Sequence, residues 1–238
     1  MTLLPNETHV HYVTKESPEH DLLSGDFHLL SPQERERMAR FKFEDVRAQY
    51  GRTRALVRRL LSAYAPGVEP EEWAFGEGAK GKPFVSGPRA GLYFNVTHTP
   101  GLIACAVAAV PEIGLDAELV SREVDFAGVA RHSFAPDEIA LLSTLSGTEL
   151  REKFFYLWTL KEAYVKARGL GFSMGVSKFS FAGSAARGGE PEVVFDASLG
   201  ERSSDWKFES LVPAPGHLLA VALKTSASLD LRVERFAF

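Results

Sequence analysis

The sequence has a single cysteine and no long hydrophobic run. Because Cys105 is the one cysteine among 238 residues, no disulfide can form within the chain, which suits a reducing cytoplasm. The longest apolar run, residues 102–110, is too short to cross a bilayer, and the first ten residues lack the basic start and apolar stretch of an export signal. We therefore expect a soluble, cytoplasmic protein without a membrane partner.

Charge of either sign is modest overall but unevenly distributed. The formal net charge is −4, and a hydrophobic content of 45% excludes a disordered or collagen-like chain. The segment from Arg35 to Arg59 contains nine basic and three acidic residues, a local charge of +6. This segment is either a solvated helix face or the contact for a local anionic partner. Nucleic-acid binding usually needs a broadly basic domain, so no nucleic-acid partner is expected.

A capped helix start followed by strands organises the first half. Ser31 precedes a proline and is followed three residues later by Glu34, which is the pattern of a capping box. One long helical region is expected to continue from there to about Tyr64. Residues 91–94 and 102–110 have the composition of strands in a small sheet.

The second half repeats this order. Residues 135–138 echo the first helix start with a poorer cap, and a second capping box at residues 146–149 opens a helix expected to end at Arg168. A Pro-Gly turn and an apolar strand at residues 215–222 parallel those at residues 100–107. Strand-like runs in between cover residues 178–181, 192–195 and 206–212.

The repeat predicts an α+β fold of two pseudo-twofold-related lobes, each a small antiparallel sheet packed on a long helix. The lobes are expected at residues 1–110 and 113–238, joined near Pro111, with the cleft between them as the ligand site. One chain then supplies both walls of the cleft, so a monomer is sufficient.

Two carboxylates lie two residues apart in an alternating segment. A strand at residues 113–119 places Asp116 and Glu118 on one face and Leu115, Ala117 and Leu119 on the other. Acids about 7 Å apart along a strand face suit a hard cation. An ordinary exposed strand face is the alternative.

A helical stripe in the second half combines an aromatic, an acidic and a basic residue. Trp158, Glu162 and Lys166 follow one another at intervals of four and therefore share one side of a helix. An exposed Glu–Lys pair is one interpretation; the neighbouring aromatic residues favour a partly buried stripe.

Two further segments suggest phosphate contacts. Residues 76–82 match the Gly-x4-Gly-Lys pattern of a nucleotide-binding phosphate loop, but Pro83 offers no hydroxyl and the following residues cannot open a helix. Lys82 remains as a cation on a turn, or as part of a plain surface turn. Thr97 and His98, just before a Pro-Gly turn, could donate to phosphate oxygens, although a lone histidine is commonly a satisfied structural residue.

The order of these motifs resembles the 4'-phosphopantetheinyl transferase superfamily, in its two-lobed, surfactin-synthetase-activating type. The resemblance covers most of residues 31–172. Its last two motifs, about 45 residues apart, are the most specific. The matching pieces are Gly-Lys-Pro at 81–83, Phe-Asn-Val-Thr-His at 94–98, Gly-Leu-Asp-Ala-Glu at 114–118 and Trp-Thr-Leu-Lys-Glu-Ala-Tyr-Val-Lys at 158–166.

The resemblance implies transfer of the phosphopantetheine arm of coenzyme A to a serine hydroxyl of an acyl- or peptidyl-carrier protein, with release of 3',5'-ADP. It implies that Asp116, Glu162 and Glu118 hold Mg²⁺ against the pyrophosphate. Glu162 is the implied base for the serine proton, and Lys166 would offset the negative charge that develops. Ala117, between the two acids, has no side chain that could be a ligand.

The resemblance also assigns contacts with the rest of coenzyme A. Thr97, which stands where many members carry serine, and His98 would hold phosphate oxygens. Lys82 and Arg37 of the first lobe would hold the nucleotide and its 3'-phosphate. The match at Arg37 is looser, so Arg35 or Arg40 could take its role.

Two other functions use the same residues. A metal-dependent phosphodiesterase or nuclease would need a nucleic-acid surface, which the acidic balance disfavours. A module that binds coenzyme A or a carrier protein without turnover would not require the three carboxylates.

Overall fold

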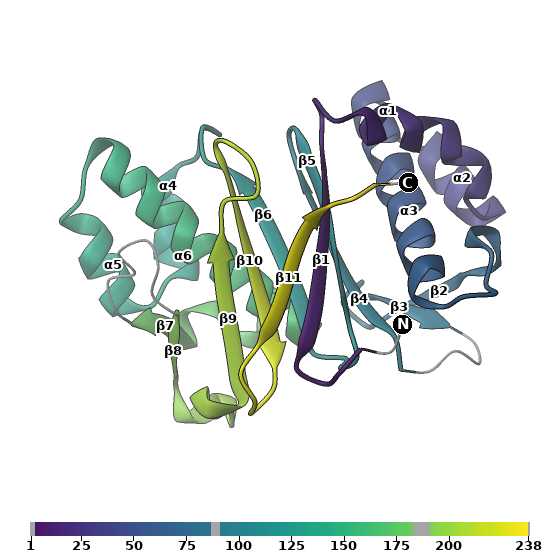
Figure 1. Cartoon of the computed structure of the whole chain (residues 1–238). Coiled ribbons are helices and arrows are strands. Elements are labelled where there is room, and N and C mark those ends of the chain that lie inside the picture. Colours follow the sequence, from purple (N-terminus) through teal and green to yellow (C-terminus); the bar gives the residue numbers. More distant parts are fainter. Residues whose placement is uncertain (1–2, 87–90, 183–190, 238) are drawn as a thin grey trace.

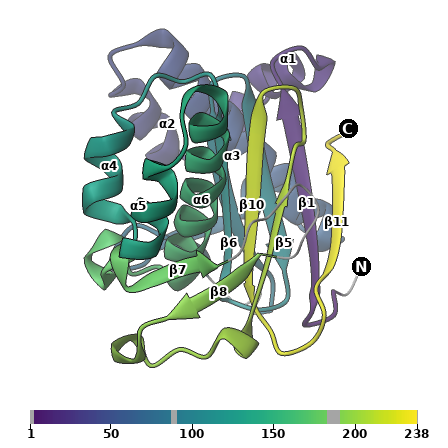
Figure 2. The ribbon, with the colours of Figure 1, turned by 90° about the vertical axis from the view of Figure 1, so that its left-hand side faces the viewer.

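The computed structural model describes residues 3–86, 91–182 and 191–237. Its elements form four layers, with helices outside and two sheets inside (Figure 1). α3 packs on one sheet, and α1 and α2 pack against α3. α6 packs on the other sheet, with α4 and α5 on its outer side, and this half of the molecule lies nearer the viewer in Figure 2. The α+β class is confirmed. In the described part of the chain, no helix is both long and apolar enough to span a membrane.

The helices of the first lobe begin as expected but form two pieces. The capping box at Ser31 is present, with the Glu34 amide donating to Ser31 Oγ at 3.2 Å. The single helix expected up to Tyr64 is wrong, because Arg40 closes the first piece with a bond to the Arg37 carbonyl and the chain turns before the second. The helices are α1 Pro18–Gly25, α2 Pro32–Ala39 and α3 Glu44–Tyr64.

The helices of the second lobe end in the long α6. Its C-terminus is closed by Gly169 at φ 62°, as expected. The capping box expected at Ser146 is wrong: its side chain caps no amide in this part of the chain, and Gly147 follows in a left-handed conformation at φ 55°. The helices are α4 Phe126–Ser133, α5 Pro136–Ser143 and α6 Gly147–Arg168.

The four-stranded sheet draws on both ends of the chain. Its order is β11-β1-β5-β4, and β1 pairs antiparallel with β5 but parallel with β11. β11 therefore completes the sheet of the first lobe, which corrects both the purely antiparallel expectation and the assignment of all residues from 113 to 238 to the second lobe. Without β11, β1 would be an open edge. The strands are β1 Glu7–Thr14, β4 Tyr93–Thr99, β5 Leu102–Ala108 and β11 Asp230–Arg235.

The second sheet has three antiparallel strands in the order β6-β10-β9, and two hairpins flank the sheets. These strands are β6 Ile113–Leu119, β9 Trp206–Leu211 and β10 His217–Lys224. The hairpins are β2 Ala74–Glu77 with β3 Pro83–Ser86, and β7 Phe179–Ala182 with β8 Glu192–Phe195.

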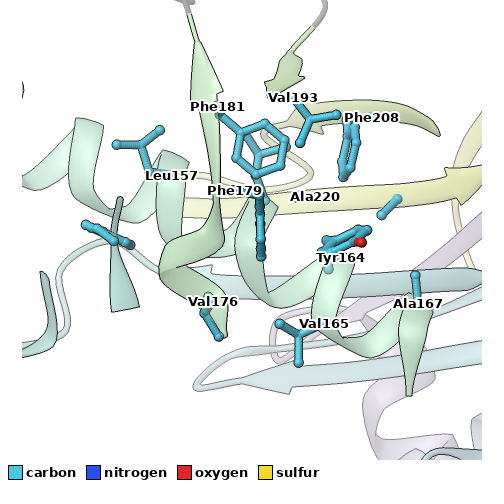
Figure 3. Packing of buried hydrophobic residues seen from close by; sticks show 14 of the residues in the cluster. Leu157, Tyr164, Val165, Ala167, Val176, Phe179, Phe181, Val193, Phe208 and Ala220 are labelled. Carbon is cyan, nitrogen blue, oxygen red and sulfur yellow. The ribbon is translucent and has the colours of Figure 1, made fainter. Parts of the chain in front are cut away.

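Three buried clusters hold the layers together. The cluster between the sheets pairs small residues of β5, such as Ala104 and Ala106, with larger ones of β6 and β10, such as Leu115 and Leu219. A second cluster lies under α3. The third lies under α6, where Tyr164 packs against Phe179 with ring centroids 4.7 Å apart (Figure 3).

The two Pro-Gly turns of the repeat meet at the lobe junction. Gly101 and Gly216 both have positive φ, at 85° and 73°, which favours glycine. The ring nitrogens of His217 lie 2.9 Å from the Pro100 carbonyl oxygen and 3.0 Å from that of Pro215. His217 thus links the turn of one lobe to the turn of the other.

Candidate active site

The site forms where α6 packs closely on β6, at Gly114. A Cβ atom at this position would lie 1.9 Å from the Ala163 carbonyl oxygen and 2.5 Å from the Ala167 amide nitrogen. Both contacts are with backbone, so any larger residue would push the helix away from the strand. This glycine therefore allows the stripe of α6 to reach the acidic pair of β6.

Lys166 joins this stripe to the first acid. Its ammonium nitrogen lies 2.7 Å from Asp116 Oδ1, 3.2 Å from Thr97 Oγ1 and 3.1 Å from the Leu115 carbonyl oxygen. Burial raises the pKa of Asp116, and Lys166 and Thr97 offset this only in part. Asp116 Oδ2 is buried and has no hydrogen-bond partner among the described residues.

Trp158 joins the same stripe to the second acid. Its indole nitrogen donates to Glu118 Oε1 at 3.0 Å, and Arg122 donates to the same oxygen at 2.9 Å. Burial raises the pKa of Glu118, and the charge of Asp116 adds to the effect. The expectation of a partly buried stripe on α6 is confirmed.

Glu162 lies between Trp158 and Lys166 on α6 and is half-buried. Its pKa is raised to about 7, first because burial removes water from the carboxylate and then because Asp116 and Glu118 repel its charge. Lys166 acts in the opposite direction but does not cancel these effects. Three carboxylates thus share one electrostatic environment.

A cleft of about 460 Å³ opens beside these residues. Both lobes line it: β4 contributes Thr97 and His98, and β6 contributes Asp116 and Glu118, with Lys166 from α6. The His98 residue is exposed at this surface. Its pKa is lowered, first because neighbouring groups remove water from the charged ring and then because the Lys166 charge repels it. Among the residues predicted from sequence, these five come together.

Lys82 and Arg37 lie apart from this group. Lys82 donates to the carbonyl oxygens of Pro111 at 2.8 Å and Ala167 at 2.7 Å, and burial lowers its pKa to about 8. It lines a second cleft, of about 320 Å³. Arg37 is exposed and pairs with Glu77 at 2.5 Å. Their contacts with a nucleotide stay predictions.

The donor set around Asp116 has the chemistry that Mg²⁺ prefers. An unpartnered buried carboxylate oxygen, and acids that raise one another's pKa, suit a hard cation. Within residues 3–86, 91–182 and 191–237, no three histidine, cysteine, aspartate or glutamate side chains are grouped closely enough to hold an ion. The residues thus fit the ion by their chemistry but are not gathered around one point, so the ligand set stays a prediction.

Three polar residues that line the cleft among the described residues were not predicted from the sequence: Arg122, Gln49 and Thr99. Arg122 follows Glu118 by four residues, so its position after the acidic pair was the available signal. Gln49 lies on α3, and its amide nitrogen lies 3.5 Å from the Thr99 carbonyl oxygen. No local pattern separates Gln49 from an ordinary helix residue.

The fold and the cleft define a class: a two-lobed α+β protein with an acidic, lysine-bridged site between its lobes. The model of the 4'-phosphopantetheinyl transferase superfamily matches residues 112–222. Over 227 residues the chain is 33% identical to the 4'-phosphopantetheinyl transferase HetI of Nostoc sp., covering 94% of this chain and 90% of that protein. The chain belongs to the 4'-phosphopantetheinyl transferase superfamily.

Two other relatives illustrate the range of the similarity. The 4'-phosphopantetheinyl transferase Sfp of Bacillus subtilis is 28% identical over 155 residues, which are 63% of this chain and 65% of that protein. The human L-aminoadipate-semialdehyde dehydrogenase-phosphopantetheinyl transferase is 25% identical over 209 residues, which are 82% of this chain and 67% of that protein.

Proposed function

We propose that the protein transfers the 4'-phosphopantetheine group of coenzyme A to a serine of an acyl- or peptidyl-carrier protein and releases 3',5'-ADP. The observation that carries this proposal is the cleft lined by Asp116, Glu118 and Lys166, in which Lys166 donates to Asp116 Oδ1. Glu162 lies one helical turn before Lys166 on α6, and the charges of Asp116 and Glu118 help to raise its pKa. The names of the relatives support the same activity. Because both walls of the cleft come from one chain, we propose that the protein acts as a monomer. We also propose a cytoplasmic location and no nucleic-acid or membrane partner.

Asp116, Glu118 and Glu162 are proposed to hold Mg²⁺. When bound, the ion would neutralise charge on the pyrophosphate and polarise the attacked phosphorus. The buried, unpartnered Oδ2 of Asp116 supports its role as a ligand. Glu118 already accepts hydrogen bonds from Trp158 and Arg122 through Oε1, which orients its carboxylate.

The transfer itself needs alignment and charge compensation more than covalent chemistry from the protein. Glu162 accepts the proton of the carrier serine, directly or through a water molecule, as the serine oxygen attacks the β-phosphorus. A new P–O bond forms to serine while the bond to the leaving 3',5'-ADP breaks. Lys166 offsets the negative charge that develops on the phosphate oxygens.

The remaining contacts divide between the lobes: the first lobe, whose sheet β11 completes, is proposed to lie on the nucleotide side, and the second lobe is proposed to supply the metal and catalytic residues. His98 faces the cleft and is proposed to donate to a phosphate oxygen. The Thr97 hydroxyl lies 3.4 Å from Asp116 Oδ1 and would have to turn from it to do the same. Lys82 and Arg37 are proposed to hold the nucleotide and its 3'-phosphate.

The test is incubation with coenzyme A, Mg²⁺ and several apo-carriers, followed by intact-mass measurement of the carrier. The wild type should add one phosphopantetheine group, EDTA should stop the reaction, and Mg²⁺ should restore it. Glu162→Gln should abolish transfer, whereas Glu149→Gln, an exposed acid on the same helix, should leave it unchanged.

Each alternative gives a different result in this experiment. A phosphodiesterase or nuclease would cleave without modifying the carrier, and a binding module would leave both reactants intact. Full transfer by Glu162→Gln would remove the proposed base, and turnover without metal would remove the proposed ion.

A further inference from the structure

The feature that the proposed reaction leaves unexplained is the seam between the two sheets. β4 is the last strand of one sheet and β6 is the last strand of the other, and no backbone ladder joins them within the described residues. Side chains of β4 bridge the two strands instead. Asn95 Oδ1 accepts the Leu115 amide at 2.9 Å, Thr97 Oγ1 accepts the Ala117 amide at 3.2 Å, and Thr99 Oγ1 accepts the Leu119 amide at 3.1 Å.

These three bonds form a regular ladder. Each step advances two residues along both strands in the same direction, so β4 and β6 run parallel with a fixed register. Asn95, Thr97 and Thr99 are all buried, at 3–4% exposure. Removing the acceptor of Asn95 or Thr97 would leave a buried amide of β6 unpaired, and removing that of Thr99 would leave a part-buried one, which folded proteins avoid.

The ladder surrounds the acidic residues of the site. Each of the three bonds is one rung of the ladder. Asp116 lies between the rungs at Leu115 and Ala117, and Glu118 lies between those at Ala117 and Leu119. At Leu115 both backbone groups are held, because Asn95 accepts from its amide and Lys166 donates to its carbonyl oxygen. The position of the acids relative to β4 therefore depends on these rungs.

The corresponding edge of the first sheet is covered in a different way. β1 pairs with β5 as β6 pairs with β10, and the free edge of β1 is covered by ordinary parallel backbone pairing with β11. Polar side chains replace backbone groups at the edge that carries the acids. This contrast indicates that the ladder serves the site as well as the fold.

We propose that Asn95 and Thr99 are positioning residues for Asp116 and Glu118. By holding the amides of Leu115 and Leu119, they set the two carboxylates for the cation and the pyrophosphate. Asn95 does not line the cleft, and the Thr99 hydroxyl is committed to Leu119, so both act through β6. The proposal rests on the proposed transferase function.

The test compares variants that remove an acceptor with matched controls. Asn95→Leu and Thr99→Val each remove one rung at similar volume, and Thr99→Ser keeps the hydroxyl. Thr53→Val is the control, because the Thr53 hydroxyl is also buried but donates to the Gln49 carbonyl oxygen within α3. Unfolding free energy, Mn²⁺ affinity by electron paramagnetic resonance and the kinetics of carrier modification are measured for the wild type and for these four variants.

Both rung variants should lower Mn²⁺ affinity and kcat by about tenfold, the effect of one lost hydrogen bond, with the KM for the carrier within about twofold. Thr99→Ser and Thr53→Val should retain wild-type values. If Asn95→Leu does not fold, Thr99→Val decides the question.

The outcomes separate this proposal from the proposed function. Rung variants that match Thr53→Val in both metal affinity and kcat would overturn the positioning role, as would a wild type that binds no Mn²⁺. A wild type that binds Mn²⁺ but modifies no carrier would overturn the transferase function, while the Mn²⁺ affinities of the variants would still decide the role of the ladder.

Discussion

The two lobes bury the same kind of ion pair at the same point of the fold. In the first lobe, Glu34 of α2 bonds the backbone amide that precedes its own helix and pairs with Arg58 of α3 at 2.7 Å. In the second lobe, Glu138 of α5 does the same and pairs with Lys161 of α6 at 2.8 Å. Each cation then donates to carbonyl oxygens in the segment after its helix, Pro70 and Glu71 for Arg58, and Val176 and Phe179 for Lys161.

The pairs differ in the number of cations. Burial acts to raise the pKa of both glutamates, but Glu34 also contacts Arg54, and the two guanidinium groups with the cap amide lower its pKa below the usual value. Within the described ranges Glu138 pairs with Lys161 as its one cation, and the pKa of Glu138 stays raised. The two guanidinium groups and the cap amide thus outweigh burial at Glu34, whereas Lys161 and two backbone amides do not outweigh it at Glu138.

The residue after the buried cation differs in chemistry between the two lobes. In α3 this residue is Arg59, which pairs with Asp26 inside its own lobe. In α6 it is Glu162, whose pKa is raised in part by the charges of Asp116 and Glu118 on β6. Both lobes keep the scaffold, and the second lobe supplies the acids.

The largest effect on stability is expected for Lys161→Met, which leaves Glu138 buried without its cation. Breaking a buried ion pair from one side costs about 3–5 kcal/mol of unfolding free energy. Urea denaturation measures this loss, and the double variant Glu138→Leu with Lys161→Met should recover part of it. A loss below about 1 kcal/mol would contradict the importance of the pair.

A smaller loss is expected for Arg58→Met, because Arg54 still pairs with Glu34. The unfolding free energy should fall by about 1–3 kcal/mol, mainly from the Pro70 carbonyl and the Glu34 oxygen that lose a donor. The same urea titration gives the value. A loss equal to that of Lys161→Met would show that the number of cations is not what separates the lobes.

The smallest effect is a difference in pH dependence. The folded-state pKa of Glu34 lies below that of the unfolded chain, so its contribution is present above the unfolded pKa and is lost as the pH falls through the folded pKa. Glu138 has a raised pKa, so its contribution is present in acid and is lost as the pH rises through the folded pKa.

The unfolding free energy should therefore fall less steeply between about pH 5 and pH 3 in Glu34→Gln than in the wild type. Glu138→Gln should not show this shallower slope. Urea titrations across this range measure both slopes. Equal flattening by the two variants would contradict the opposite directions of the two pKa shifts.

Local signals in the sequence predicted the parts of the fold that depend on neighbouring residues. The capping box at Ser31, the glycine after Arg168 and the stripe from Trp158 to Lys166 follow from spacing alone, and the structure has all three. The break between α2 and α3 has no proline or glycine to mark it. Phe41 leaves the helix there and packs on Tyr50 at a centroid distance of 5.3 Å, which is a tertiary contact.

The candidate site was predictable in composition but not in its contacts. Asp116, Glu118 and Lys166 lie close together as the motifs indicate, whereas the hydrogen bond of Thr97 to β6 depends on the register between β4 and β6, which no local pattern specifies. β1 and β11 were missed for a similar reason. Their pairing joins segments more than 200 residues apart, and β1 is buried on both faces, which removes the usual alternation.

The return of β11 to the first sheet links folding to the order of synthesis. The ribosome makes β1 early and its partner β11 after the whole second lobe, so the edge of β1 stays open while the rest of the chain emerges. Residues 1–110 released alone would present that edge to other chains. An intact second lobe is thus what delivers the last strand of the first.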